Sequence, residues 1–245
     1  MDLPIPDLDP GVVAALATTL VVGAAVQGMV GLGLGLVSAP VAMLLEPSVM
    51  PDLLLWLAML LPMATLLREH DEIDWPGLGW SLAARVPGTV VGVALVAAIS
   101  LRWLGVAVGL VVLVSVLLTV HTVVIPVNRG SLVGAGFISG VSGTASSIGG
   151  PPLAVLLQHR TPRQIRTTLA VYFLLGAAFS LVGLWVVGRL DVDVMMLALL
   201  LSPCLLAGLG VARLLSGVLP RDQVRYAVLA VCGASAVVLL VRSLV

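Results

Sequence analysis

Two helix-breaking stretches interrupt an otherwise apolar chain, and they constrain its fold more than any other feature. The first glycine loop is Gly28–Pro40, and the second glycine loop is Gly140–Pro152. Soluble domains place such clusters at surface turns, but hydrophobic runs flank both loops here. Irregular backbone inside a bilayer is tolerated only where protein or a water-filled cavity surrounds it. The sequence therefore predicts that both loops lie in the middle of a membrane.

The rest of the chain is apolar enough to supply the helices of a bundle. Hydrophobic residues make up 60% and charged residues 10%, against about 45–50% and about 25% in globular domains. Segments of membrane length, about 20 residues, fall at 52–67, 77–99, 103–120, 167–187, 194–213 and 225–243. The regions 11–46 and 131–158 are apolar but interrupted by the glycine loops, which is typical of broken or re-entrant helices. We therefore predict an all-α polytopic membrane protein.

The two halves of the chain resemble each other. Three residues of the first loop recur 112 positions later, pairing Gly28 with Gly140, Gly31 with Gly143 and Pro40 with Pro152. At offsets of 116 to 117, Asp74 pairs with Asp191, Pro87 with Pro203 and Gly92 with Gly208. These matches predict a duplication, with a first membrane repeat at 1–126 and a second at 127–245. Each repeat would hold a glycine-broken re-entrant or short helix pair and three transmembrane helices.

The arginines indicate how the repeats are oriented. If each glycine-loop region is a hairpin, the repeats are inverted and eight arginines share one side: Arg68, Arg129, Arg160, Arg163, Arg166, Arg213, Arg221 and Arg225. The other side then holds Arg102, Arg189 and Arg242. If both regions cross the membrane completely, the bias weakens to seven against four. Since positive charge marks the cytoplasmic side, inverted repeats are favoured, and both termini are extracytoplasmic in either arrangement.

The glycine loops have the composition of an anion site. Pro40 and Pro152 predict the first turns of two short helices, and a helix that begins in the midplane points free N–H groups and a positive dipole end at the centre. Glycines let a ligand approach the backbone, and hydroxyls add donors. The predicted substrate-binding residues in the loops are Gly31, Gly33, Gly35, Ser38, Pro40, Ser142, Gly143, Thr144, Ser146, Ser147, Gly149, Gly150 and Pro152. Small-residue helix packing is the alternative for Gly28 and Gly31.

Arg85 completes the predicted site. It lies about nine residues inside the apolar segment 77–99, so its charge needs either a partner or a wet cavity. The alternative is that its side chain snorkels to the membrane surface. In the first case Arg85 would attract an anion towards the centre.

Two short glycine-rich loops ending in proline, repeated in a compact duplicated chain of about eight hydrophobic segments, resemble the TauE/SafE sulfite exporter family. The resemblance extends over nearly the whole chain. It implies a transporter of sulfite, a sulfonate, sulfoacetate or a related organic anion in the inner or plasma membrane. Gly-Leu-Gly-Leu-Gly in the first loop and Thr-Ala-Ser-Ser in the second depart from the denser glycine runs common in that family. Neither loop holds a cysteine, which argues against the thiosulfate-handling relatives that use pore cysteines.

Two other functions compete with a secondary transporter working by alternating access. A passive anion channel would use the same loops. An intramembrane serine protease is the second rival, because Gly140-Val-Ser142-Gly143 matches the Gly-x-Ser-Gly element of rhomboid proteases. Such a serine needs a histidine base, and the histidines of this chain, His70, His121 and His159, fall in predicted connecting segments. We therefore expect no enzyme.

No cofactor or metal is expected. Cys204 and Cys232 lie in apolar runs without a histidine or second cysteine at metal-ligand spacing. The acidic residues at 69–74 are interpreted as a solvated cytoplasmic loop beside Arg68 rather than a metal site. The sequence predicts a small anionic substrate and the lipid bilayer as partners and leaves a homo-oligomer open. Zero net charge and the lack of a basic patch give no indication of nucleic acid.

Overall fold

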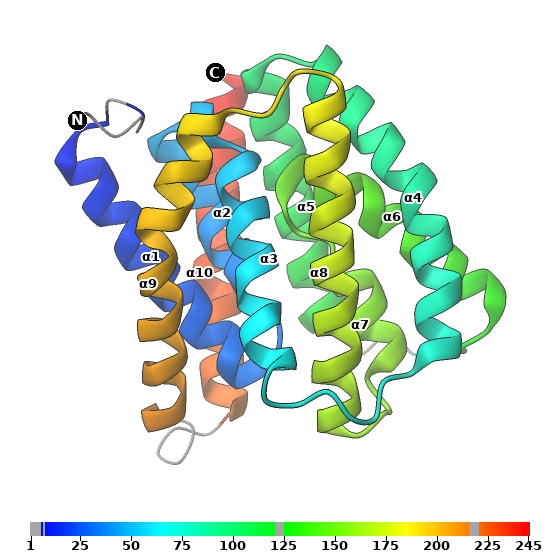
Figure 1. Ribbon diagram of the computed structural model, residues 1–245. Helices are drawn as coiled ribbons and strands as arrows, with labels where there is room; N and C mark the ends of the chain where they lie inside the picture. The colour runs from blue at the N-terminus through cyan, green and yellow to red at the C-terminus, as the bar shows by residue number, and fades with distance from the viewer. Residues whose placement is uncertain (1–5, 7, 121–124, 216–220) are drawn as a thin grey trace.

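The computed structural model describes residues 6, 8–120, 125–215 and 221–245, and over these residues the chain is helical, with no strand (Figure 1). The predicted all-α class is confirmed. In chain order the elements are α1 (Pro10–Val30), α2 (Leu34–Leu45), the 3₁₀ turn η1 (Pro47–Val49), α3 (Asp52–Leu66), α4 (Trp75–Ala98), α5 (Leu101–Val120), α6 (Arg129–Ser146), α7 (Pro151–Leu157), α8 (Pro162–Val186), α9 (Val192–Leu215) and α10 (Arg221–Leu244).

The glycine loops break the chain at the two predicted places. Helix α1 ends at Val30 and is capped by Gly31, whose φ of 90° is a left-handed conformation that glycine adopts without strain. Helix α6 ends at Ser146 and is capped by Ser147, which has a φ of 59°. Each break is followed by a short helix, α2 or α7, so each glycine-loop region is a pair of helices.

The two short helices do not begin alike. Helix α7 begins at Pro151, so a proline-marked start is confirmed in the second loop. The predicted start at Pro40 is wrong, because α2 begins at Leu34 and Pro40 lies inside it. A proline there removes one backbone hydrogen bond of α2. Helix α2 consequently has 12 residues and α7 only 7.

Six described helices are long and apolar enough to cross a membrane, namely α1, α4, α5, α8, α9 and α10. Five of them correspond to predicted spans. The sixth predicted span, 52–67, is the shorter helix α3 of 15 residues, about 22 Å long at 1.5 Å per residue. The sixth helix of membrane length is α1 instead, since its 21 residues reach about 31 Å.

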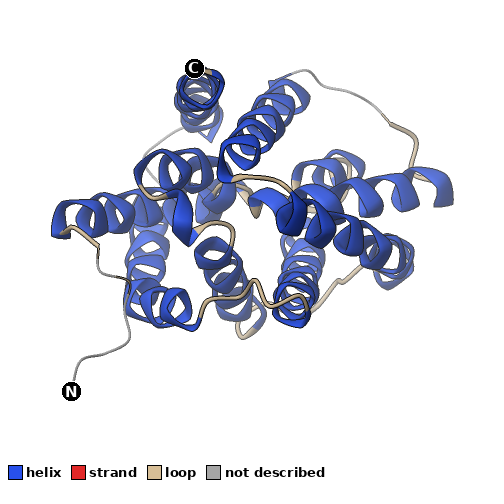
Figure 2. Cartoon of the chain, turned by 90° about the horizontal axis from the view of Figure 1, so that it is seen from above, coloured by secondary structure: helices blue, strands red, loops and turns tan. Residues whose placement is uncertain are grey.

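The helices run up and down between two ends of the bundle. At the lower end of Figure 1, α3 connects to α4 and α7 to α8, and α9 ends there. At the upper end, α4 connects to α5 and α8 to α9, α1 begins and α10 ends. Seen from the upper end, the described helices lie side by side (Figure 2). The segments that carry the eight arginines grouped by the inverted arrangement thus gather at the lower end.

The most extensive helix contacts join the two halves of the chain. The main neighbours are α1 with α9, α4 with α6, α3 with α8 and α5 with α10. If α1–α5 correspond in order to α6–α10, then α1 corresponds to α6 and α4 corresponds to α9. The α1–α9 pair therefore corresponds to the α6–α4 pair. In the same way α3 corresponds to α8, so the α3–α9 contact corresponds to the α8–α4 contact. Both contacts occur.

Glycines bring the backbones of these pairs together. Between α1 and α9, a Cβ at Gly28 would lie 2.7 Å from Ala212 Cβ, and a Cβ at Gly208 would lie 2.5 Å from the carbonyl oxygen of Val21. Gly140 and Gly92, their counterparts in the sequence repeat, do the same between α6 and α4. These four glycines therefore serve close helix packing.

The glycine loops lie where two hydrophobic cores meet. The larger core draws on α1, α2, α3, α5, α9 and α10, and the smaller on α4, α6, α7 and α8. Leu32 of the first loop packs against both. A change in how the cores fit together would therefore act directly on the loops.

Candidate functional site

The two glycine loops line a small cavity, which we call the loop cavity. Its volume is about 50 Å³, which is room for on the order of three or four water molecules. Glycines from both loops line it: Gly33, Gly35, Gly149 and Gly150. The loops are in direct contact, since a Cβ at Gly35 would lie 2.7 Å from the carbonyl oxygen of Ser147. Any larger residue at position 35 would separate them.

Helices α2 and α7 both begin at the loop cavity, but they offer different donors. The N–H of Leu34, the first residue of α2, donates to Gln27 Oε1 at 3.0 Å. The next two N–H groups of α2 have no partner within the helix, and their residues line the cavity. Helix α7 begins with two prolines, which have no N–H to donate. Helix-start donors at this cavity therefore come mainly from the first loop.

Arg85 is buried in the bundle, only 3% exposed. Its guanidinium carbon lies 4.4 Å from the centre of the Tyr172 ring. Nη1 donates to the carbonyl oxygen of Tyr172 at 3.4 Å and to Ser139 Oγ at 3.5 Å. A Cβ at Gly176 would overlap the guanidinium, so the glycine makes room for it. The Arg85 side chain therefore lies inside the bundle instead of snorkelling to its surface.

The charge of Arg85 is not compensated by a carboxylate among the described residues. The ion pairs there all involve other side chains, and Arg85 Nε has no hydrogen-bond partner. The guanidinium borders the second glycine loop, because Nη2 lies 3.0 Å from a Cβ built at Gly143 and 3.3 Å from one built at Gly149. Burying an unpaired ion costs several kcal/mol. A buried cation thus lies directly against the lining of the loop cavity.

Several predicted site hydroxyls are used for packing instead. Ser38 Oγ donates to the carbonyl oxygen of Thr19 in α1, at 3.4 Å. Thr144 Oγ1 bonds Ser180 Oγ of α8 at 2.8 Å. Ser146 Oγ donates to the carbonyl oxygen of Ser142 at 2.6 Å. None of these three residues, nor Pro40, lines the loop cavity.

The remaining predicted residues are divided among different places. Ser147 lines the loop cavity and donates from Oγ to the carbonyl oxygen of Pro51 at 3.2 Å. Ser142 and Pro152 line a separate apolar cavity of about 500 Å³ between α5, α6 and α7. Gly31 lines a third cavity, about 200 Å³ in volume, at the lower ends of α1, α3, α8 and α9. Gly143 contacts Arg85.

Three residues at the site were not predicted. Gln27 caps α2, Tyr172 covers the Arg85 guanidinium, and Phe173 lines the loop cavity. Gln27 could have been found, since it is the one amide side chain between residues 11 and 45. The two aromatic residues carry no comparable signal, because an aromatic pair in an apolar segment is ordinary core composition.

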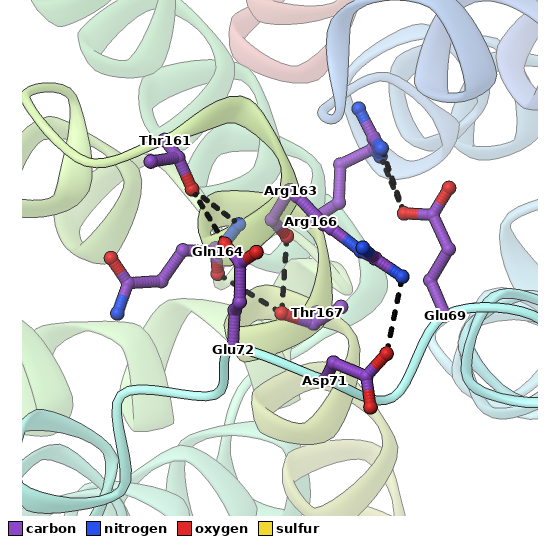
Figure 3. Close-up of polar contacts among 8 residues, drawn as sticks. All are labelled: Glu69, Asp71, Glu72, Thr161, Arg163, Gln164, Arg166 and Thr167. Atoms are coloured by element: carbon purple, nitrogen blue, oxygen red, sulfur yellow. Dashed lines mark hydrogen bonds and ion pairs between the residues drawn. The ribbon is translucent and has the colours of Figure 1, made fainter.

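The acidic loop between α3 and α4 pairs with the start of α8 (Figure 3). Glu69 lies 2.7 Å from Arg166, and Asp71 lies 3.2 Å from Arg163. Glu72 Oε2 accepts a hydrogen bond from Thr161 Oγ1 at 3.1 Å. The acids are thus spread along the loop, each facing its own partner, rather than converging on one point. No group of three or more metal-ligating side chains occurs in the described ranges.

Comparison with known protein families gives a match over nearly the whole chain. The family model described as sulfite exporter TauE/SafE matches residues 15–239. No curated protein and no solved structure matches the chain. The match includes both glycine loops, Arg85 and every helix that lines the loop cavity. With nearly its whole length matched, the chain belongs to the sulfite exporter TauE/SafE family of membrane transporters.

Proposed function

We propose that this protein is a secondary transporter of a small anion, such as sulfite, a sulfonate or a related organic anion. The anion binds in the loop cavity, between the start of α2 and the second glycine loop, and the site opens alternately to the two sides of the membrane. Family membership supports the class of substrate. The chemistry of the cavity supports its charge.

The observation that carries the proposal is the uncompensated Arg85 guanidinium against Gly143 and Gly149. At a separation of about 7 Å and an effective dielectric constant of about 20, a bound anion gains roughly 2 kcal/mol from this charge. The N–H groups at the start of α2 add to the attraction. A cation in the same cavity would be repelled by both.

Helix packing supports the inverted duplication, an arrangement found in many alternating-access transporters. The α1–α9 and α4–α6 pairs exchange when the halves are exchanged, and corresponding glycines make the close contacts in each. Such repeats commonly rock about a central site. The arginine-rich lower end is the cytoplasmic side in this proposal, with both termini outside, in the cell membrane.

Anion binding is tested first by thermal unfolding of the purified protein in detergent. The ligands are sulfite, methanesulfonate, sulfoacetate and acetate, each at fixed sodium concentration with sodium chloride as the control. A ligand at 100 times its Kd stabilises the folded state by about 2.7 kcal/mol, so the melting temperature should rise for at least one sulfur oxyanion. Absence of a shift with all four anions would contradict the proposal.

The role of Arg85 is tested by substitution. Arg85→Gln should lower the apparent anion affinity at least tenfold, and Arg85→Lys should retain part of it because the charge stays. Arg102→Gln is the matched control, since Arg102 is exposed and donates to the carbonyl oxygen of Ser243. A folded Arg85→Gln protein that binds the anion with wild-type affinity would exclude this role.

The rival functions give different results. Flux into proteoliposomes that saturates and is driven uphill by an opposing anion gradient identifies a carrier, and unsaturated downhill flux identifies a channel. A protease is not favoured, because Ser142 Oγ donates to the carbonyl oxygen of Ile148 at 3.0 Å rather than to a described histidine. Ser142→Ala should therefore leave transport unchanged.

A further inference from the structure

The 200 Å³ cavity at the lower end, which we call the vestibule, has a charged lining. It lies among α1, α3, α8 and α9. Three arginines and one glutamate line it, Arg68, Arg166, Arg213 and Glu69. Since Arg166 and Glu69 form an ion pair, their charges offset each other, and Arg68 adds positive charge to the lining. The vestibule therefore attracts anions at its mouth.

The vestibule and the loop cavity have two lining residues in common, Gln27 and Phe173. Gln27 holds the start of α2 through the Leu34 N–H. Phe173 packs closely against the second glycine loop, because a Cβ at Gly150 would lie 2.8 Å from Phe173 Cζ. These two side chains thus stand between the two cavities.

We propose that the vestibule is the route by which the anion reaches the loop cavity from the arginine-rich end, and that Phe173 is the partition which closes it. This inference rests on the proposed anion transport. It adds a pathway, a conformational state and a gating residue. In this conformational state the protein is open towards the arginine-rich end, and the Phe173 ring closes off the loop cavity.

The position of Phe173 links the partition to the buried charge. Its neighbour Tyr172 covers Arg85, and the rings of Tyr172 and Phe173 lie 6.3 Å apart in an edge-on arrangement. A shift of α8 that moves Phe173 away from Gly150 therefore also moves the ring over Arg85. Opening the partition and uncovering the cation are parts of one movement.

The larger apolar cavity is a poor alternative route. Its lining holds no charged residue, and its polar side chains are Ser115, Ser131 and Ser142. An anion that entered there would lose its hydration without gaining a counter-charge. The vestibule supplies that counter-charge from its entrance inwards.

Thiol labelling tests the route. In a background with Cys204 and Cys232 changed to serine, Thr65→Cys places a thiol in the vestibule, and Ser100→Cys places one on the exposed α4–α5 connection at the other end. Each is treated with a methanethiosulfonate reagent bearing either a sulfonate or a trimethylammonium group. Relative to Ser100→Cys, Thr65→Cys should react about tenfold faster with the sulfonate reagent than with the ammonium reagent.

Labelling must also affect sulfite transport in proteoliposomes. Modification of Thr65→Cys should reduce transport at least tenfold, whereas modification of Ser100→Cys should leave it unchanged. Full transport after complete modification of Thr65→Cys would overturn the vestibule route while leaving anion transport established. Absence of transport in both unlabelled proteins would instead count against the proposed function itself.

The partition is tested with a thiol in the loop cavity. Ala58→Cys lines that cavity on α3, and its labelling should speed up at least tenfold when Phe173→Ala is added. Phe179→Ala, an exposed position on the same helix, should leave the labelling rate unchanged. Equal rates with and without Phe173→Ala, in proteins of equal melting temperature, would overturn the partition.

Discussion

The guanidinium of Arg85 fills the space that any side chain at Gly176 would need. One residue lies on α4 and the other on α8, so the absence of a side chain on one helix fixes the position of a charge on the other. The site therefore depends on a residue with no functional group of its own.

Gly176→Ala should displace Arg85 and destabilise the protein by about 3 kcal/mol, since overpacking and disturbance of a buried charge act together. Thermal unfolding in detergent measures the effect, and anion affinity should fall with it. Gly210→Ala is the control, because nothing lies within 4 Å of a Cβ at that position, and should change stability by less than about 0.5 kcal/mol. Combining Gly176→Ala with Arg85→Met should recover part of the lost stability but none of the lost binding.

The α4–α6 contact gives a sharper comparison within one helix. A Cβ at Gly136 would overlap the carbonyl oxygen of Ser81, whereas a Cβ at Gly134 meets nothing within 4 Å. Gly136→Ala should therefore cost about 2 kcal/mol or more, because backbone must move to admit the methyl group. Gly134→Ala should be nearly neutral. Equal melting temperatures for the two variants would show that the helices do not pack this closely.

Gln27 allows structure and binding to be separated. Gln27→Glu keeps an oxygen that accepts from the Leu34 N–H and places a negative charge at a helix start, where it is stabilising. Folding should therefore be retained, but anion affinity should fall at least tenfold because the carboxylate repels the ligand. Gln27→Ala should instead lower stability by about 1 kcal/mol through loss of the cap. Titration with sulfite and thermal unfolding of the same samples distinguish the two effects.

The vestibule charge should be visible in the salt dependence of transport. Glu69→Gln removes one negative charge from its lining, and Arg68→Gln removes one positive charge. Each unit charge at about 10 Å in water is worth about 0.4 kcal/mol, so the sulfite KM should change about twofold in opposite directions. The difference should shrink as ionic strength increases. The lost Glu69–Arg166 pair is partly exposed, so stability should change by no more than about 1 kcal/mol.

Most of the membrane-length helices could be predicted from sequence because hydropathy is the main determinant of which segments enter a bilayer. The start of α2 could not. The repeat equates Pro40 with Pro152, but in the second loop Gly149 and Gly150 stand directly before the prolines, whereas the last glycine of the first loop, Gly35, lies five residues before Pro40. The N–H of Leu34, where α2 begins, donates to the Gln27 side chain, a contact between residues seven positions apart that no local pattern indicates.

The sequence predicted the kinds of residue at the candidate site better than it predicted which of them line the cavity. Glycine, hydroxyl and arginine composition pointed to the two loops and to Arg85. Which hydroxyls reach a cavity depends on how the helices are rotated, so Ser147 lines the loop cavity while Thr144, three residues earlier, bonds Ser180 on α8. Phe173 could not be found at all, because its place is set by the packing of α8 against the second loop.

Close packing of α1 on α9 also sets an order of events during synthesis. Helix α1 ends at Val30 and α9 begins at Val192, so at about 5–20 residues per second α1 waits roughly 8–30 s for its main neighbour. Helix α4 meets α6 much earlier. We expect chains arrested before Val192 to be cleaved by protease within α1 much faster than complete chains, and equal cleavage would contradict this order. The helices translated late thus do more than extend the bundle, because α1 gains its main packing contact only when α9 has been made.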